Sequence, residues 1–383
     1  MRKRLCWLAI PTMLCLLYRP APAAEPALHC QWTNPNTKQP LALTFQDNPL
    51  IVALPGQTII LSSSCQGATG QVTIFKDDQP IRTSQSISLA APEKPGSYFI
   101  PLALEAGGMR RDSEICIFVP HKATARRAPK GLDVIVDGEN IGFYRDPALS
   151  GNQKVRDNPA SYQPPVWWLR ITDTNAHFSL VPGLKADDLV VASEDTGTKH
   201  TDTVPVCYPM WLTVHSLRAA LETRGIPGSA LKLISVYRAP AYNRGIGSNA
   251  YGRHIFGDAF DFYIDLEGDE KASDLNQDRR RDRRDAYPVV AVIEDLMADG
   301  KIPMGGIGIY NTVGGDHEVT MHYDARGHRA TWGFHFGASG KKSNFAWASR
   351  RFADLDRHEE NLAAERASRE GRSYVRPNRE PLQ

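Results

Sequence analysis

The sequence has no excess of charge of either sign. It carries 45 Lys and Arg residues against 43 Asp and Glu residues, a formal net charge of +2 over 383 residues. A balance this close to neutrality gives no compositional reason to expect nucleic acid or an acidic membrane surface as a partner. Beyond residue 24 the sequence also lacks an apolar run of about 18 residues, so we expect no stable membrane anchor there.

The first 24 residues have three parts. A basic start, Arg2–Arg4, precedes an apolar run, Leu5–Tyr18, and the small residues Ala21–Ala24 follow. This order is typical of a secretory signal peptide. Leu14, directly before Cys15, is not the small residue that a lipoprotein cleavage site requires. We therefore expect an exported protein, either periplasmic or extracellular.

Cysteine is scarce, and no cysteine has the close Cys/His spacing of a structural zinc site. Beyond the expected signal peptide the cysteines are Cys30, Cys65, Cys116 and Cys207. Four cysteines in an oxidising compartment favour disulfides, with three connectivities open. A bond between Cys65 and Cys116 is preferred because both lie in strand-like runs of one segment.

Short runs of strand-forming residues recur between residues 41 and 119. Turn signals such as Pro55-Gly56, Asp77-Asp78 and Gly107-Gly108 separate them. We therefore expect residues 25–119 to form a small all-β, immunoglobulin-like sandwich. This segment shows no cluster of titratable residues, which favours a spacer or docking module whose protein partner is unknown.

Two segments look unlike a packed domain. Residues 120–131 are polar and basic with no apolar period, which is typical of a linker. Residues 346–383 are rich in Arg, Glu and Ala, and their apolar residues are too sparse for a deep core. We expect a charged helical tail there.

Residues 132–345 mix helix and strand patterns, which predicts an α+β domain. Apolar residues recur at helical spacing over Trp211–Thr223 and Tyr287–Ala298. Strand patterns cover Leu231–Tyr237, Gly306–Tyr310 and Val319–Tyr323.

One stretch of this domain offers metal ligands. Asp261 follows His254 by seven residues, and Gly257 and Ala259 between them suit a loop that leads into a strand. A strand period of two places Ala259, Asp261 and Tyr263 on one face. Imidazole and carboxylate are typical zinc ligands, although a hydrogen-bonded surface pair would show the same spacing.

A second stretch completes the ligand set. Residues 318–324 read as a strand in which Glu318, Thr320, His322 and Asp324 share one face. Two histidines and one aspartate give zinc three ligands and leave a fourth position open, which is the arrangement of catalytic rather than structural sites.

Three motifs in this order resemble one family of enzymes. Tyr-Arg-Xaa-Pro-Xaa-Tyr-Asn begins at Tyr237, Arg-His-Xaa-Xaa-Gly-Xaa-Ala-Xaa-Asp begins at Arg253, and Met-His-Tyr-Asp-Xaa-Arg-Gly begins at Met321. Together they resemble the D-alanyl-D-alanine carboxypeptidase and murein endopeptidase family, which belongs with the lysostaphin and hedgehog-type zinc proteins. The resemblance covers about residues 132–337.

The resemblance implies a site and an activity. His254, Asp261 and His322 would hold zinc, and Arg238 would bind and polarise the substrate, although a structural salt bridge is the simpler role for this arginine. The domain would be an α+β zinc peptidase of the hedgehog and D-alanyl-D-alanine peptidase type that hydrolyses amide bonds in peptidoglycan stem peptides or cross-links. Zinc suits this reaction because it polarises a carbonyl group and lowers the pKa of bound water.

The general base is where the sequence departs from the family. Many relatives place a histidine two residues before the last ligand or an acid three before it, and here these positions are Thr320 and Val319. Asp324 and Glu318 remain as catalytic candidates. Asp324 is preferred, since at two residues beyond His322 it can either hold a water or orient that ligand. The departure also supports an alternative, a peptidoglycan-binding protein that keeps the fold without cleaving.

A loop after Asp261 imitates a calcium site. Oxygen ligands stand at positions 1, 3, 5, 9 and 12 of a calcium loop, as Asp274, Asn276, Asp278, Asp282 and Asp285. Position 6 should be glycine for a sharp turn, but it is Arg279. A calcium site, a degenerate loop that keeps its shape without calcium, and an arginine-rich loop that meets solvent or an anionic wall polymer all stay open.

Overall fold

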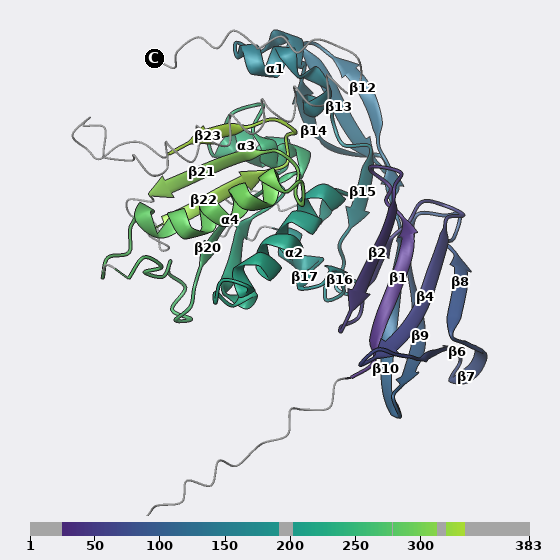
Figure 1. Cartoon of the computed structure of the whole chain (residues 1–383). Coiled ribbons are helices and arrows are strands. Elements are labelled where there is room, and N and C mark those ends of the chain that lie inside the picture. Colours follow the sequence, from purple (N-terminus) through teal and green to yellow (C-terminus); the bar gives the residue numbers. More distant parts are fainter. Residues whose placement is uncertain (1–24, 191–201, 278, 312–318, 334–383) are drawn as a thin grey trace, which may run out of the picture.

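The chain has a β-rich, multidomain fold with few helices (Figure 1). The structure, a computed structural model, describes residues 25–190, 202–277, 279–311 and 319–333. The signal peptide expected over residues 1–24 and the tail expected over residues 346–383 lie outside the described residues. No helix in the described part of the chain is long and apolar enough to cross a membrane.

Two five-stranded sheets form the N-terminal part of the chain. The first contains β2 (Pro40–Phe45), β1 (Ala27–Thr33), β4 (Thr58–Cys65), β5 (Ala68–Thr69) and β8 (Ser86–Ala90). The second has the order β3 (Leu50–Val52), β10 (Met109–Val119), β9 (Gly96–Ala106), β6 (Gln71–Lys76) and β7 (Gln79–Ser84). Alternate residues of β4 are buried, among them Ile59 and Leu61, and they share a core with Leu104 of β9.

The segment expected to be a linker contains strands instead. β11 (His121–Lys122) pairs with β15 (Trp167–Arg170), which pairs with β18 (Thr203–Pro205). β12 (Thr124–Ala128) forms a three-stranded sheet with β13 (Gly131–Val136) and β14 (Glu139–Arg145). Strand β12 is exposed along most of its length, so its side chains carry no apolar period while its backbone pairs with β13.

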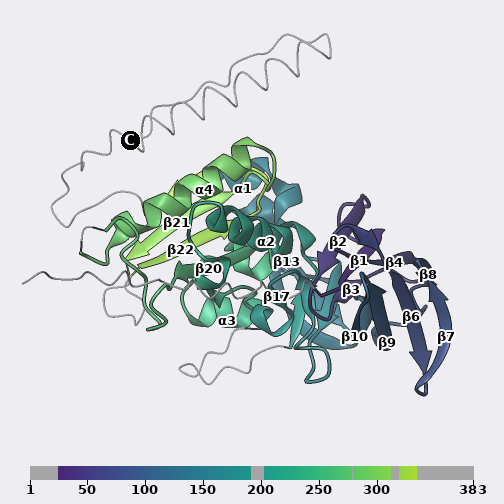
Figure 2. The same cartoon turned by 60° about the horizontal axis from the view of Figure 1, so that its bottom comes forward.

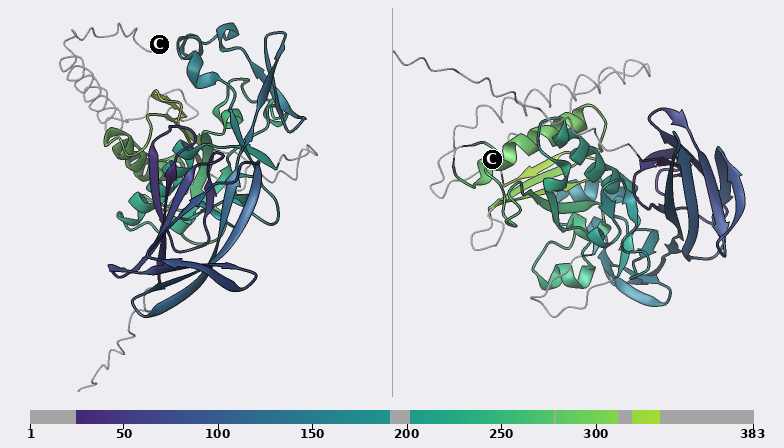
Figure 3. Two further views of the ribbon diagram at one scale, coloured as in Figure 1. Left: turned by 90° about the vertical axis from the view of Figure 1, so that its right-hand side faces the viewer. Right: turned by 90° about the horizontal axis from the view of Figure 1, so that it is seen from below.

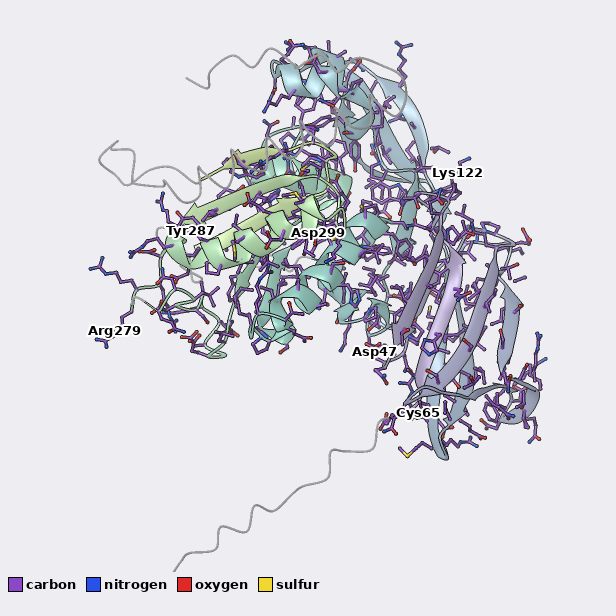
Figure 4. The ribbon with its side chains drawn as sticks, in the orientation of Figure 1. Asp47, Cys65, Lys122, Arg279, Tyr287 and Asp299 are labelled. Carbon is purple, nitrogen blue, oxygen red and sulfur yellow. The ribbon has the colours of Figure 1, made fainter. Side chains whose placement is uncertain are left out.

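The N-terminal sheets are docked against the rest of the chain rather than tethered to it (Figure 3). The backbone amide of Val52 donates to the Tyr208 hydroxyl at 3.2 Å, and the Asn175 side chain donates to Ser97 Oγ at 2.9 Å. Asp47, labelled in Figure 4, accepts a hydrogen bond from Ser179 Oγ across the same junction. One continuous hydrophobic core therefore joins the two parts.

A third five-stranded sheet lies towards the C-terminus. Its order is β19 (Leu231–Ser235), β20 (Ala259–Ile264), β22 (Val319–Asp324), β21 (Gly306–Asn311) and β23 (Ala330–Trp332). All neighbours are antiparallel except β21 and β23. Apart from short 3-10 turns, the remaining elements are the helices α1 (Gln153–Asp157) and α3 (Pro240–Gly245) and the paired strands β16 (Ser179–Val181) and β17 (Leu184–Lys185).

Helices α2 (Tyr208–Glu222) and α4 (Ala286–Ala298) pack together, and α4 lies against β22 (Figure 2). Both helices confirm the periodicity seen in the sequence. Helix α2 begins three residues before the expected Trp211, since Pro209 lies in its first turn, where a missing amide proton costs no hydrogen bond. Buried valines and Ile293 give α4 its apolar face.

The expected disulfide is absent. No disulfide joins Cys30, Cys65, Cys116 and Cys207 among the described residues. Cys65 ends β4 of one sheet, whereas Cys116 lies within β10 of the other, where it pairs with Phe99 of β9. Because the two sheets are separate layers of the core, the shared strand character of the two cysteines does not bring their sulfur atoms together.

Candidate metal centre

Three separate segments bring His254, Asp261 and His322 to one place. Asp261 of β20 lies directly opposite His322 of β22 in the antiparallel register. His254 lies in the 3-10 turn η5 (Arg253–Phe256), which ends at Gly257. Gly257 has a φ of 73°, and a Cβ there would lie 2.8 Å from Pro205, so only glycine lets the chain turn from η5 into β20.

The donor atoms of these residues lie close together, and Asp261 faces each histidine through a different oxygen. His254 Nε2 is 3.3 Å from His322 Nδ1 and 3.2 Å from Asp261 Oδ2. His322 Nδ1 is 2.7 Å from Asp261 Oδ1. A tetrahedral ion with bonds of about 2.0–2.1 Å separates neighbouring ligand atoms by about 3.3 Å, and two imidazoles with a carboxylate are a zinc ligand set. The residues present therefore fit zinc.

Each imidazole is held in one orientation by its other nitrogen. His254 Nδ1 is 2.6 Å from the carbonyl oxygen of Val236, to which it donates, and this leaves Nε2 as the nitrogen with a lone pair for a metal. His322 Nε2 is 3.0 Å from Asp324 Oδ2, which leaves Nδ1 facing the other two donors. Such outer partners fix the tautomer and the ring plane of metal-binding histidines.

Asp324 is enclosed by its partners. Its side chain is fully buried, and Arg326 donates to it twice, from Nε and Nη2, each at 2.6 Å. Burial alone would raise the pKa of Asp324, but the Arg326 guanidinium and His322 hold that pKa well below its usual range. Of the two roles predicted for Asp324, the geometry favours orienting His322 over receiving a proton from water.

Arg238 lies beside the ligand carboxylate. Its Nε donates to Ser235 Oγ at 2.8 Å, and its Nη2 forms an ion pair with Asp261 Oδ2. The backbone amide of Arg238 also donates to the carbonyl of His254 at 3.2 Å, so the arginine is fixed to the turn that carries His254. Burial would raise the pKa of Asp261, but His254 and His322 lower it well below its usual range.

Two aromatic residues of the centre have no counterpart in the sequence prediction. The Trp332 ring lies 4.9 Å from the His322 ring, and Trp332 Nε1 donates to the Tyr310 hydroxyl at 2.7 Å. Gly308 makes this possible, because a Cβ at that position would lie 2.4 Å from Trp332 Nε1. The signal in the sequence is the pair Gly306 and Gly308 within a strand, a position where glycine marks close approach of another group.

Of the remaining predicted site residues, those that the structure describes lie away from the centre. Glu318 and Asp278 lie outside the described residues. In the loop before α4 the described acids have other partners: Asp285 accepts the backbone amides of Asn276 and Asp282, Asp282 pairs with Arg284, and Asp274 accepts the amide of Arg279.

The loop does keep the sharp turn of a calcium loop. Arg279, which projects from it in Figure 4, has a φ of 68° at the position that glycine should occupy. The described acids of Asp274–Asp285 do not form a group of three metal-binding side chains. The structure instead brings Asp265, Glu267 and Asp269 together, with both oxygens of Asp265 already accepting backbone amides.

The comparisons with known proteins add no relative. The family models give no match to this chain, and neither do the curated proteins.

Proposed function

We propose that the chain is an exported zinc-dependent peptidase of the D-alanyl-D-alanine carboxypeptidase and murein endopeptidase type. Its substrates would be amide bonds in peptidoglycan stem peptides or cross-links. The observation that carries the proposal is the convergence of His254, Asp261 and His322, which come from η5, β20 and β22, with donor atoms about as far apart as tetrahedral zinc requires.

The side chains around these donor atoms have separable tasks. A zinc ion held by His254, Asp261 and His322 would supply a Lewis acid that polarises a carbonyl group and acidifies water. Asp324 holds His322 in the ring orientation that this requires. Arg238, permanently charged, would bind a substrate carboxylate or the negative charge that develops on the carbonyl oxygen. The Tyr310 hydroxyl accepts a hydrogen bond from Trp332 Nε1, and its own proton would therefore be available to donate to substrate.

The proposal includes the finer architecture. Residues 132–345 would be the α+β zinc domain of the hedgehog and D-alanyl-D-alanine peptidase type. Residues 25–119 would be an immunoglobulin-like sandwich that docks the enzyme, in keeping with its lack of a titratable cluster in the sequence. The signal peptide pattern supports a location in the periplasm or outside the cell.

One observation favours a second candidate, a peptidoglycan-binding protein that does not cleave. The carboxylates of Asp261 and Asp324 are both occupied by arginine, which leaves neither of them placed to receive a proton from water. A protein with this centre could hold zinc and a peptide carboxylate without turnover.

Metal analysis and digestion of purified peptidoglycan separate the candidates. The purified chain should contain about one zinc per molecule and release new amines, and His254→Ala should lose both. His177→Ala is the matched control, because His177 is an exposed histidine remote from the three donors in sequence and in fold. Binding to peptidoglycan with zinc present and no new amines would favour the second candidate, and a metal-free protein that leaves peptidoglycan unchanged contradicts the first.

A further inference from the structure

A cavity lies where the β12–β14 sheet meets helix α3. Its volume is about 370 Å³, within the range of about 300–1,000 Å³ that small-molecule sites occupy. One wall comes from the turn between β12 and β13 and from β14, and the other from α3 and the loop that leads to η5. The lining residues are Pro129, Lys130, Phe143, Arg145, Pro240, Asn243, Arg244, Ser248, Ala250 and Ile255.

The charge of this cavity has one sign. Lys130, Arg145 and Arg244 line it, and the described lining residues include no acid. The nearest acid along the chain, Asp146, directs its carboxylate to the backbone amide of Ala148 at 2.9 Å. Three cations from two distant stretches of sequence around one hollow give a positive potential that attracts an anion.

One lining residue, Asn243, carries a buried acceptor that has no partner among the described residues. Asn243 is 2% exposed, and its Nδ2 donates to the carbonyl of Asn249 at 2.9 Å, which fixes the orientation of the amide. Its Oδ1 is buried and has no hydrogen-bond partner. A buried polar atom without a partner costs free energy, about 1–3 kcal/mol, unless a ligand or water supplies a donor.

The rest of the lining is apolar. Pro129, Phe143, Pro240, Ala250 and Ile255 provide carbon surface on both walls. A bare inorganic anion would leave this surface in water. An organic acid with apolar groups matches both features of the cavity, the cations and the apolar walls.

We propose that this cavity binds a small organic acid with apolar groups, such as an acylated amino acid or a short peptide with a free carboxylate. The carboxylate lies among Lys130, Arg145 and Arg244, and the apolar groups of the ligand pack against Phe143, Pro240 and Ile255. The site is distinct from the metal centre, since none of His254, Asp261 and His322 lines the cavity. It therefore does not depend on zinc or on cleavage.

Calorimetric titration with matched probes tests this proposal. N-acetyl-alanyl-alanine should bind the full chain, and its C-terminal amide should bind at least about tenfold more weakly because it lacks the charge. Inorganic phosphate that binds as tightly as the peptide acid would overturn the proposal, because it would show a site for bare anions.

The cations are tested by substitution. Lys130 has a φ of 68°, so Lys130→Asn removes its charge with a residue that tolerates this backbone. Each of Lys130→Asn, Arg145→Gln and Arg244→Gln should weaken binding by about threefold, and the triple variant by about 30-fold, since exposed charge pairs are individually weak. A control triple variant changes three exposed lysines outside the cavity: Lys76, Lys94 and Lys232.

Two further variants separate this site from the metal centre. Binding should persist in His254→Ala and in Arg238→Gln, whatever their effect on zinc or peptidoglycan. Binding that is lost in Arg238→Gln and retained in the triple variant would place the carboxylate at the metal centre instead, and would refute the proposal. Absence of cleavage with these binding results intact would refute the peptidase proposal alone.

Discussion

Replacing Asp324 with asparagine tests how the centre is held together. The Asp324 carboxylate faces His322 Nε2 at 3.0 Å. It accepts two hydrogen bonds from the Arg326 side chain, and one each from the backbone amides of Arg326 and Gly306, both at 3.3 Å. Asparagine keeps one acceptor oxygen and presents an amide group to side chains that donate. Arg326 would lose its counter-ion, and His322 would lose the partner that fixes its ring.

The structure sets the size of both effects. Breaking a buried ion pair costs about 3–5 kcal/mol, but the Arg326 side chain keeps 17% of its surface exposed and recovers part of its hydration. We therefore expect Asp324→Asn to lower the free energy of unfolding by about 2–3 kcal/mol. Loss of an outer partner of a metal ligand lowers metal affinity by about 10–100-fold, which is the drop expected for zinc.

Urea unfolding and zinc competition with a chromophoric chelator measure these two quantities. Asp112→Asn is the matched control: Asp112 is 77% exposed and pairs with Arg110, so that its loss should cost less than about 1 kcal/mol and leave zinc affinity unchanged. Asp324→Asn with normal stability and normal zinc affinity but no cleavage would refute the reasoning, because it would make Asp324 the proton acceptor rather than the support of His322.

Three further predictions concern the rest of the chain. Burial raises the pKa of Cys116 and of Cys207 to about 12. Both thiols should therefore react slowly with a thiol reagent at pH 8 in the native state, and rapidly once the chain is unfolded without reductant. Thiols that stay unreactive after unfolding would show a disulfide. Gly308→Ala should displace Trp332 from His322, lower stability by about 1–3 kcal/mol and change tryptophan fluorescence, and an unchanged spectrum would contradict this. Tyr208→Phe should lower the free energy of unfolding, measured with urea, by about 1–3 kcal/mol, because it leaves the backbone amide of Val52 in β3 without its acceptor. A change near zero would mean that the junction does not depend on this hydrogen bond.

Local patterns in the sequence predicted both long helices and the four neighbouring strands β19, β20, β21 and β22. Apolar spacing in α2 and α4 arises from one buried face, and a helix carries that information within its own residues. Strand β12 shows the limit, since its exposed side chains say nothing about the backbone pairing with β13. The cysteines show a second limit: strand character places a residue in a sheet but does not say in which of two sheets.

The candidate metal donors could be found in the sequence because each half of the set lies in a short motif. His254 lies in the turn that leads into the strand of Asp261. His322 reaches these two residues through the pairing of β20 with β22. Trp332 and Tyr310 were not predictable in the same way. Their contact depends on β23 joining β21 in parallel, a pairing that no local pattern specifies.

X-ray absorption at the zinc edge tests the central claim most directly. The account predicts about one zinc per chain with only nitrogen and oxygen neighbours at about 2.0–2.1 Å, among them two imidazoles, and loss of one imidazole contribution in His322→Ala. A shell that contains sulfur at about 2.3 Å, or a spectrum unchanged in His254→Ala and His322→Ala, would contradict the assignment of this centre.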